Sequence, residues 1–214
     1  GKKLEDIDSP MIVKPIDFFS FQERAVLVLP YIQGETLQDK MGKKHEKIDL
    51  SWLYMIALGL DKLKEKGFYH GDLKPTNIMI TPTRSVKLID PGLTLEDPTS
   101  ILKITTPIYN PLLLDGERAD LMARGIMLYK MFGRTFPFKD VPFEYAGADL
   151  SNETNMLEMM YFISTVPMMM VNPKPNVIDR SIERIVCKCF NPTNDYNHKD
   201  FAGDLNEYAT RFKK

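Results

Sequence analysis

Cysteine is scarce in this sequence, and the two cysteines present predict neither a disulfide bond nor a metal site. The 214 residues include two cysteines, Cys187 and Cys189, which lie two positions apart. Residues at positions i and i+2 of a helix do not share a face, and the two thiols lack the further ligands that a zinc site needs. They therefore predict reduced core thiols on a helix, which favours an intracellular, cytoplasmic location.

The sequence also lacks a surplus of either charge and a long hydrophobic run. These absences argue against a nucleic acid and a membrane as partners. There are 28 basic and 29 acidic residues, so the formal net charge is −1, and no basic excess points to a nucleic acid. The longest apolar stretch lies near Leu53–Leu60, far too short to span a bilayer. The sequence shows no signal peptide. We expect a globular protein that binds neither nucleic acid nor membrane.

The apolar periodicity predicts a protein that is mainly α with a small β portion. Two β-rich runs, Met11–Phe19 and Ala25–Tyr31, flank a polar turn and indicate a β-hairpin. The predicted helices span Glu35–Lys44, Asp49–Lys66, Asp115–Phe132, Asn152–Thr165, Asp179–Phe190 and His198–Phe212, and two short strands span Ile78–Ile80 and Val86–Ile89. The order is not an alternating βαβ pattern, which disfavours a Rossmann-type domain.

One short segment collects the side chains that phosphoryl transfer needs. It reads Tyr69-His70-Gly71-Asp72-Leu73-Lys74-Pro75-Thr76-Asn77-Ile78-Met79-Ile80, and Val86-Lys87-Leu88-Ile89-Asp90-Pro91-Gly92 follows. Such a transfer needs a carboxylate that accepts the hydroxyl proton, oxygen ligands for Mg²⁺, and a cation near the transferred phosphate. Those types are supplied within 19 positions by Asp72, Lys74, Asn77 and Asp90. A polar surface turn would need no such spacing.

This segment resembles the catalytic loop of eukaryotic-type Ser/Thr protein kinases, His-Arg-Asp-Leu-Lys-x-x-Asn, and the Asp-Phe-Gly that follows it. The resemblance implies that Asp72 is the catalytic base and that Lys74 contacts the transferring phosphate. It implies that Asn77 and Asp90 hold Mg²⁺, and that His70 packs under the metal-binding loop. A lysine two positions after the base favours the Ser/Thr class over the Tyr class.

The segments before the catalytic loop resemble the family's hinge. Leu27-Val28-Leu29-Pro30-Tyr31-Ile32 is similar to the fifth strand of the N-terminal lobe and the hinge after it. The resemblance implies that Leu29 is the gatekeeper and that the backbone of Pro30 and Ile32 faces the adenine of ATP. Glu35 falls where the family often contacts ribose, although a solvated helix start explains it equally well. Met79 would lie beneath the adenine ring, or would simply be part of the core.

A later segment resembles the family's central helix. Residues 120–125 read Asp-Leu-Met-Ala-Arg-Gly and residues 133–138 read Gly-Arg-Thr-Phe-Pro-Phe. These are similar to Asp-x-Trp-Ser-x-Gly and to the Gly-x-x-Pro-Phe that follows the helix. The resemblance implies that Asp120 braces the backbone of the catalytic loop, where a lone aspartate would otherwise be interpreted as a helix cap. His45 and His198 show no partner in the sequence and are expected at the surface.

Three departures from the family pattern concern the catalytic and docking segments. Gly71 replaces the Arg that normally receives an activating phosphate, so Thr94, Thr99, Ser100, Thr105 and Thr106 are weak candidates for an activating site. Pro91 replaces the Phe of Asp-Phe-Gly, and proline is smaller, stiff and lacks an N–H group. The docking segment Thr106–Leu112 lacks the usual Glu, and residues 191–197 lack its Arg partner. We expect apolar contacts or neutral hydrogen bonds at that corner.

A fourth departure concerns the N-terminal lobe. The sequence before the hinge has no Gly-x-Gly-x-x-Gly and no Val-Ala-x-Lys strand. We therefore expect residues 1–32 to be a remnant of that lobe, made of the end of helix C, strands 4 and 5 and the hinge. Residues 33–214 would be the C-terminal lobe. The chain would be either a piece of a longer kinase or a reduced kinase.

Three functions remain open on this basis. The first is ATP-dependent phosphorylation of protein Ser/Thr, with ATP and Mg²⁺ as cofactors and a protein substrate as partner, incomplete or inactive in this chain alone. The second is a non-catalytic, pseudokinase-like module that binds or regulates a partner protein. The third is a small-molecule kinase of the aminoglycoside or choline kinase type, which also uses His-Gly-Asp. Lys74 and the segment from Thr106 to Phe138 argue against the third.

Overall fold

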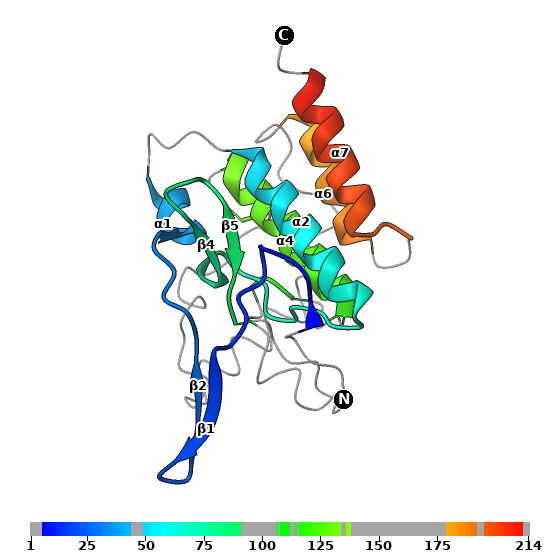
Figure 1. The fold of residues 1–214 in the computed structure, drawn as a ribbon. Helices are drawn as coiled ribbons and strands as arrows, with labels where there is room; N and C mark the ends of the chain where they lie inside the picture. The colour runs from blue at the N-terminus through cyan, green and yellow to red at the C-terminus, as the bar shows by residue number, and fades with distance from the viewer. Residues whose placement is uncertain are drawn as a thin grey trace, which may run out of the picture.

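A computed structural model of the chain describes residues 6–43, 49–90, 106, 108–111, 114, 116–133, 136–137, 179–191 and 195–211. The predicted architecture, mainly α with a small β portion, is confirmed (Figure 1). The elements are β1 (Asp17–Phe21), β2 (Arg24–Val28), β3 (Glu35–Thr36), α1 (Leu37–Gly42), α2 (Leu50–Glu65), the 3₁₀ turn η2 (Pro75–Asn77), β4 (Ile78–Ile80), β5 (Val86–Leu88), α4 (Gly116–Gly133), α6 (Arg180–Phe190) and α7 (His198–Arg211). The helix predicted at Asn152–Thr165 lies outside the described residues.

The predicted hairpin is present, with shorter strands. Strands β1 and β2 pair in antiparallel register, with Phe19 opposite Val26. The two turn residues, Gln22 and Glu23, both have positive φ (48° and 61°), as a two-residue hairpin turn of type I′ requires. The hairpin extends away from the helices (Figure 1), and its first strand is exposed along its whole length.

The first half of the predicted N-terminal strand pairs elsewhere. Ile12 forms a parallel bridge with Leu88 of β5, and the Val13 N–H donates to the Leu88 carbonyl at 3.0 Å. Ile12 and Val13 are both buried, each with 4% of its surface exposed. The apolar run that predicted one strand therefore changes partner before Asp17, from the core to the exposed hairpin.

A small sheet in the order β3-β4-β5 places the two halves of the candidate site side by side. In strand β4, Ile78 lies opposite Leu88 of β5. Asn77 directly precedes β4, and its carbonyl accepts the Ile89 N–H at 3.0 Å. Since Asp90 follows Ile89 in the chain, the pairing of two short strands holds Asn77 next to the segment that carries Asp90.

The helices form the core against which this sheet rests. Helix α2 is capped by Asp49, whose Oδ1 accepts the Ser51 N–H at 2.9 Å, and it packs against α7, while α4 packs against α6. Helix α4 is buried along nearly its whole length. None of the helices in the described ranges has the length and hydrophobicity needed to cross a membrane.

The two cysteines are free thiols, as predicted, but the expectation that both belong to the core is wrong for Cys187. Both lie on α6, and their spacing puts them on different sides of the helix: Cys189 is buried and Cys187 is exposed. Cys189 faces α4 at a close helix contact, because a Cβ added at Gly125 would lie 2.6 Å from its Cβ. The glycine in α4 therefore allows the two helices to approach.

Candidate active site

The loop after α2 is held by one buried carboxylate. The Asp120 side chain is 1% exposed, and its Oδ2 and Oδ1 accept the backbone N–H groups of His70 and Gly71, both at 2.9 Å. Burial raises the pKa of Asp120, and the nearby His70, the two N–H groups and Arg124 act against that rise. Asp120 thus fixes two consecutive peptide units of the loop, the place where the sequence predicts a brace.

Gly71 has the backbone conformation that glycine allows most easily. Its φ is +76°, in the left-handed region that costs other residues about 1 kcal/mol or more. A Cβ added there would meet no atom within 4 Å. The glycine is therefore explained by the backbone angle and not by lack of space.

His70 joins the loop to the end of β5. It is fully buried, and its Nε2 lies 3.1 Å from the Ile89 carbonyl oxygen. Because a carbonyl only accepts, Nε2 carries the hydrogen. Burial lowers the pKa of His70, so the ring is neutral at pH 7. This contact between His70 and Ile89 can support the segment that leads to Asp90, which is the role that the resemblance implies for His70.

Asp72 and Lys74 meet in a compact cluster with Thr106. The Lys74 ammonium donates to Asp72 Oδ2 at 2.6 Å and to the Thr106 hydroxyl at 2.8 Å. The Thr106 N–H and hydroxyl both donate to Asp72 Oδ1, at 2.8 and 2.7 Å. Donors on three sides thus orient the carboxylate. Thr106 is a contact that the sequence did not predict, since the threonine lies 34 residues after Asp72.

Asn77 is turned toward the same loop by its amide nitrogen. The Nδ2 atom donates to the Asp72 carbonyl at 2.9 Å. Its Oδ1 accepts no hydrogen bond from any residue in the described ranges. Asp90 is exposed and has φ +49°, a left-handed conformation that is uncommon outside glycine and most tolerated by Asn and Asp. The donor set is therefore one amide oxygen and one carboxylate.

This donor set fits Mg²⁺ better than a metal enclosed by protein. Mg²⁺ keeps several waters and is commonly held by one or two carboxylates together with substrate phosphates. Within the described part of the chain, no three His, Cys, Asp or Glu side chains converge on one metal position. Asn77 and Asp90 would hold the ion, with the nucleotide supplying further oxygens.

The residues predicted to contact adenine and ribose lie in the segment between β2 and β3, in β3 itself and in β4. Leu29, Pro30 and Ile32 are half-buried, and so is Met79 in β4. Gly34 lies between them and β3, where a Cβ would come within 2.3 Å of the Ile80 carbonyl oxygen. The chain can cross β4 this closely only with glycine.

Glu35 has local partners that the sequence did not predict. Its carboxylate pairs with Lys40 at 2.8 Å and with Lys43. These two lysines lower the pKa of Glu35 to about 2. The predicted ribose contact stays a prediction, and it now competes with two ion pairs at the start of α1.

Comparison with known proteins decides the family. The protein kinase domain model matches residues 2–196. The chain belongs to the eukaryotic-type Ser/Thr protein kinase family. Enzymes of this family in general use ATP and a divalent metal ion.

Relatives of this kinase come from plants, animals and bacteria. CBL-interacting serine/threonine-protein kinase 2 of Arabidopsis thaliana is 26% identical over 200 residues, which are 87% of this chain and 40% of the relative. Serine/threonine-protein kinase kin-29 of Caenorhabditis briggsae is 33% identical over 144 residues, which are 62% of this chain and 18% of the relative. Serine/threonine-protein kinase pkn2 of Myxococcus xanthus is 29% identical over 156 residues, which are 64% of this chain and 19% of the relative. The chain thus spans about a fifth to two fifths of these relatives.

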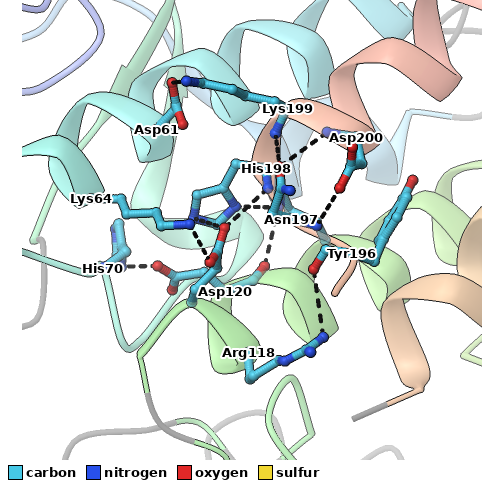
Figure 2. A network of polar contacts seen from close by, with 12 residues as sticks. Asp61, Lys64, His70, Arg118, Asp120, Tyr196, Asn197, His198, Lys199 and Asp200 are labelled. Atoms are coloured by element: carbon cyan, nitrogen blue, oxygen red, sulfur yellow. Dashed lines mark hydrogen bonds and ion pairs between the residues drawn. The ribbon is translucent and has the colours of Figure 1, made fainter. Parts of the chain in front are cut away.

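A buried polar network on the other side of Asp120 corrects one expectation for this kinase (Figure 2). His198, expected at the surface, is 1% exposed. Its Nδ1 accepts a hydrogen bond from the guanidinium of Arg124, and its backbone N–H donates to Glu117 at 3.1 Å. Burial, followed by the charge of Arg124, strongly lowers the pKa of His198. The ring is buried because α7 begins directly over α4.

The same network connects α2 to the kinase's central helix. Glu117 also pairs with Lys64 of α2 at 2.7 Å, and Lys199 at the start of α7 lies 3.7 Å from Asp61 of α2. Figure 2 shows Lys64 and His198 close to Asp120, with Asp61 and Lys199 farther from it. The part of α4 that carries Asp120 is therefore joined to α2 and to the start of α7.

The segment that resembles the family's docking loop contains neutral hydrogen bonds where it is described. Asn110 is 3% exposed and exchanges two hydrogen bonds with the Leu114 backbone, at 2.8 and 2.9 Å. Arg118 lies 3.5 Å from the Tyr196 carbonyl. Residues 112–113 and 192–194 of this corner lie outside the described residues.

Proposed function

We propose that this chain carries the catalytic lobe of a kinase that transfers phosphate from Mg·ATP to Ser or Thr of proteins. The arrangement of Asp72, Lys74 and Thr106 is the observation that supports it most directly. A carboxylate with both oxygens bonded to donors, and an ammonium 2.6 Å away, gives a hydroxyl acceptor and a phosphate contact at one place. We propose the same activity, and a protein substrate, for any longer protein that contains this chain.

The proposed roles follow the chemistry of each side chain. Asp72 accepts the proton of the substrate hydroxyl, and Lys74 beside it stabilises negative charge on the transferred phosphate. Asn77 and Asp90 would hold Mg²⁺, which would neutralise the charge on the phosphates. Thr106 keeps Asp72 and Lys74 in one geometry.

The proposal also includes the nucleoside contacts, the division into two lobes, the cellular location and the partner. Leu29, Pro30, Ile32, Met79 and Glu35 would surround the nucleoside. Residues 1–32 would be part of the N-terminal lobe and residues 33–214 the C-terminal lobe. The two free thiols support an intracellular location, and a protein substrate or regulated protein would be the partner.

Nucleotide binding is the first test. Thermal unfolding of the chain is measured with and without Mg·ATP, beside Asp90→Asn. A ligand at 100 times its Kd adds about 2.7 kcal/mol to stability, which for a chain of this size is several degrees. We expect that shift in the wild type and its loss in Asp90→Asn. Asp17→Asn, an exposed change on β1, should retain it.

Phosphate transfer is the second test and separates the three functions. Labelled ATP is supplied with a mixture of Ser and Thr peptides or with small alcohols. Transfer to the peptides that Asp72→Asn abolishes supports the proposal. Transfer to alcohols alone would replace it by a small-molecule kinase. A thermal shift without any transfer would favour a non-catalytic binding module.

A further inference from the structure

Lys130, near the end of α4, places its ammonium group against two aromatic side chains. It is half-buried. Its Nζ lies 3.3 Å from the Tyr109 hydroxyl and 4.3 Å from the ring centre of Phe136. Within the described part of the chain no carboxylate lies at ion-pair distance from it. Burial lowers the pKa of Lys130, because a less polar environment disfavours the charged form of the amine.

A short turn connects this ammonium with the candidate base. Tyr109 belongs to the turn that starts at Thr106, because its N–H donates to the Thr106 carbonyl at 2.9 Å. Thr106 in turn donates twice to Asp72. Lys130 therefore lies at one end of a turn whose other end fixes the carboxylate proposed to receive the substrate hydroxyl.

We propose that Lys130 is a specificity residue that selects protein substrates with an acidic side chain near the Ser or Thr to be phosphorylated. This rests on the proposed kinase function. A substrate carboxylate beside Lys130 would supply a counter-charge that no described residue of the chain provides. The rings of Tyr109 and Phe136 limit the access of water to one side of the ammonium, and such an ion pair is worth more than one at the open surface.

The geometry also indicates where the acidic residue lies in the substrate. The ends of a four-residue turn are less than about 7 Å apart, and the Tyr109 side chain adds a similar length. The distance from Asp72 to the ammonium is then roughly 10–15 Å, which an extended peptide covers in about three or four residues. Packing of Lys130 on the two rings by cation–π contact alone is the competing explanation, and it predicts no preference among substrates.

The experiment measures peptide binding separately from phosphate transfer. Labelled peptides carry one Ser acceptor and an Asp, an Asn or a Lys at positions two to four residues from it, on either side. Binding to the full chain with Mg·ADP is followed by fluorescence anisotropy, and kcat/KM is measured for the same peptides. We expect the wild type to prefer one Asp peptide over its Asn counterpart by about 5- to 10-fold, and the preference to weaken as salt rises.

Variants at Lys130 and one matched lysine decide between the two explanations. We expect Lys130→Met to bring the Asp/Asn ratio to about 1, Lys130→Arg to retain it, and Lys130→Glu to favour the Lys peptide. Lys62→Met, an exposed lysine of α2 paired with Glu65, should behave as the wild type. Thermal unfolding shows which variants are folded, and the salt series on the wild type needs no variant at all.

Two results would overturn the inference. One is equal affinity of the wild type for the Asp and Asn peptides at every position. The other is a preference that survives in folded Lys130→Met. These failures differ from failure of the proposed function, in which peptides bind with the Asp preference but no phosphate is transferred even though Mg·ATP binds.

Discussion

Asp120 shows how a single buried side chain can set the geometry of a loop fifty residues away in the chain. Its carboxylate receives two consecutive N–H groups, from His70 and Gly71. Both donors would otherwise be buried or half-buried without a partner, and an unsatisfied buried N–H costs about 1–3 kcal/mol. The brace therefore contributes both stability and loop position.

Replacing Asp120 by Asn tests this brace. The amide keeps one acceptor oxygen, but its NH₂ group would face the second backbone N–H and leave it unsatisfied. We expect the free energy of unfolding to fall by about 2–3 kcal/mol, measured by urea denaturation at pH 7. Asp8→Asn, at an exposed position, is the matched control and should change stability by less than about 0.5 kcal/mol. An equally small effect at Asp120 would mean that the two hydrogen bonds do not hold the loop.

Single residues also show what the sequence could and could not predict about the site. Asp72, Lys74 and Asn77 lie within six positions, so their spacing alone indicates a common site. Thr106 reaches Asp72 across 34 residues and through a segment without periodicity. His198 has no sequence neighbour that explains its burial, because its partners Arg124 and Glu117 come from another helix. Contacts that only tertiary packing creates leave no local pattern.

At the scale of elements, two helix glycines make opposite predictions. A Cβ at Gly125 in α4 would lie 2.6 Å from the Cβ of Cys189 and 2.9 Å from a ring carbon of Phe190. A Cβ at Gly203 in α7 would meet nothing within 4 Å. The same change to alanine is therefore overpacking at one site and a gain in helix propensity at the other.

We expect Gly125→Ala to destabilise the chain by about 1–3 kcal/mol, and Gly203→Ala to stabilise it by about 0.5–1 kcal/mol. Calorimetric melting of the two variants beside the wild type measures both. The sign difference is the informative quantity. If both variants melted above the wild type, α4 and α6 would not be in the close contact described here.

The helices and the short strands were predictable to within a few residues, because their apolar spacing is local. The hairpin was predicted with the wrong strand boundaries. Met11–Phe19 carries large apolar side chains on both sides of Lys14-Pro15, but Ile12 pairs with Leu88 of β5, whereas pairing with β2 begins at Ile16 and Asp17. The apolar residues do not show which strand each half pairs with, because both halves contain them.

The exposed rings of that hairpin give a third prediction. Phe18 and Phe21 are 65% and 61% exposed, so replacing both by Thr removes little buried surface and keeps good strand propensity. We expect unfolding to change by less than about 0.5 kcal/mol and self-association, followed by light scattering, to decrease. Phe201→Ser is the contrast, since that ring is fully buried, and it should cost about 3–5 kcal/mol. A comparable loss in the hairpin variant would show that its rings are covered in solution.

At the scale of the whole molecule, two buried histidines couple the fold to pH. His70 fixes the catalytic loop to the end of β5, and His198 fixes the start of α7 to α4. Burial lowers the pKa of each ring in the folded state, whereas in the unfolded chain a histidine titrates near pH 6.5. The unfolded state therefore binds more protons below that pH, and stability falls as the pH falls.

Acidification from pH 7 to pH 5.5 should accordingly weaken the fold before most carboxylates titrate. A histidine that stays neutral in the folded state costs the fold about 1.4 kcal/mol of stability per pH unit below 6.5. We expect this loss from His198, whose pKa is strongly lowered, and a further loss in the same direction from His70. The raised pKa of Asp120 acts in the opposite direction and reduces this figure. Urea denaturation at half-unit pH steps measures the slope. In His198→Asn the amide oxygen can still accept from Arg124 but nothing titrates there, so the decrease should be clearly smaller than in the wild type. Stability that stays flat between pH 7 and 5.5 in the wild type would mean that the His198 ring can take up a proton without unfolding, which is incompatible with its burial beside the charged Arg124.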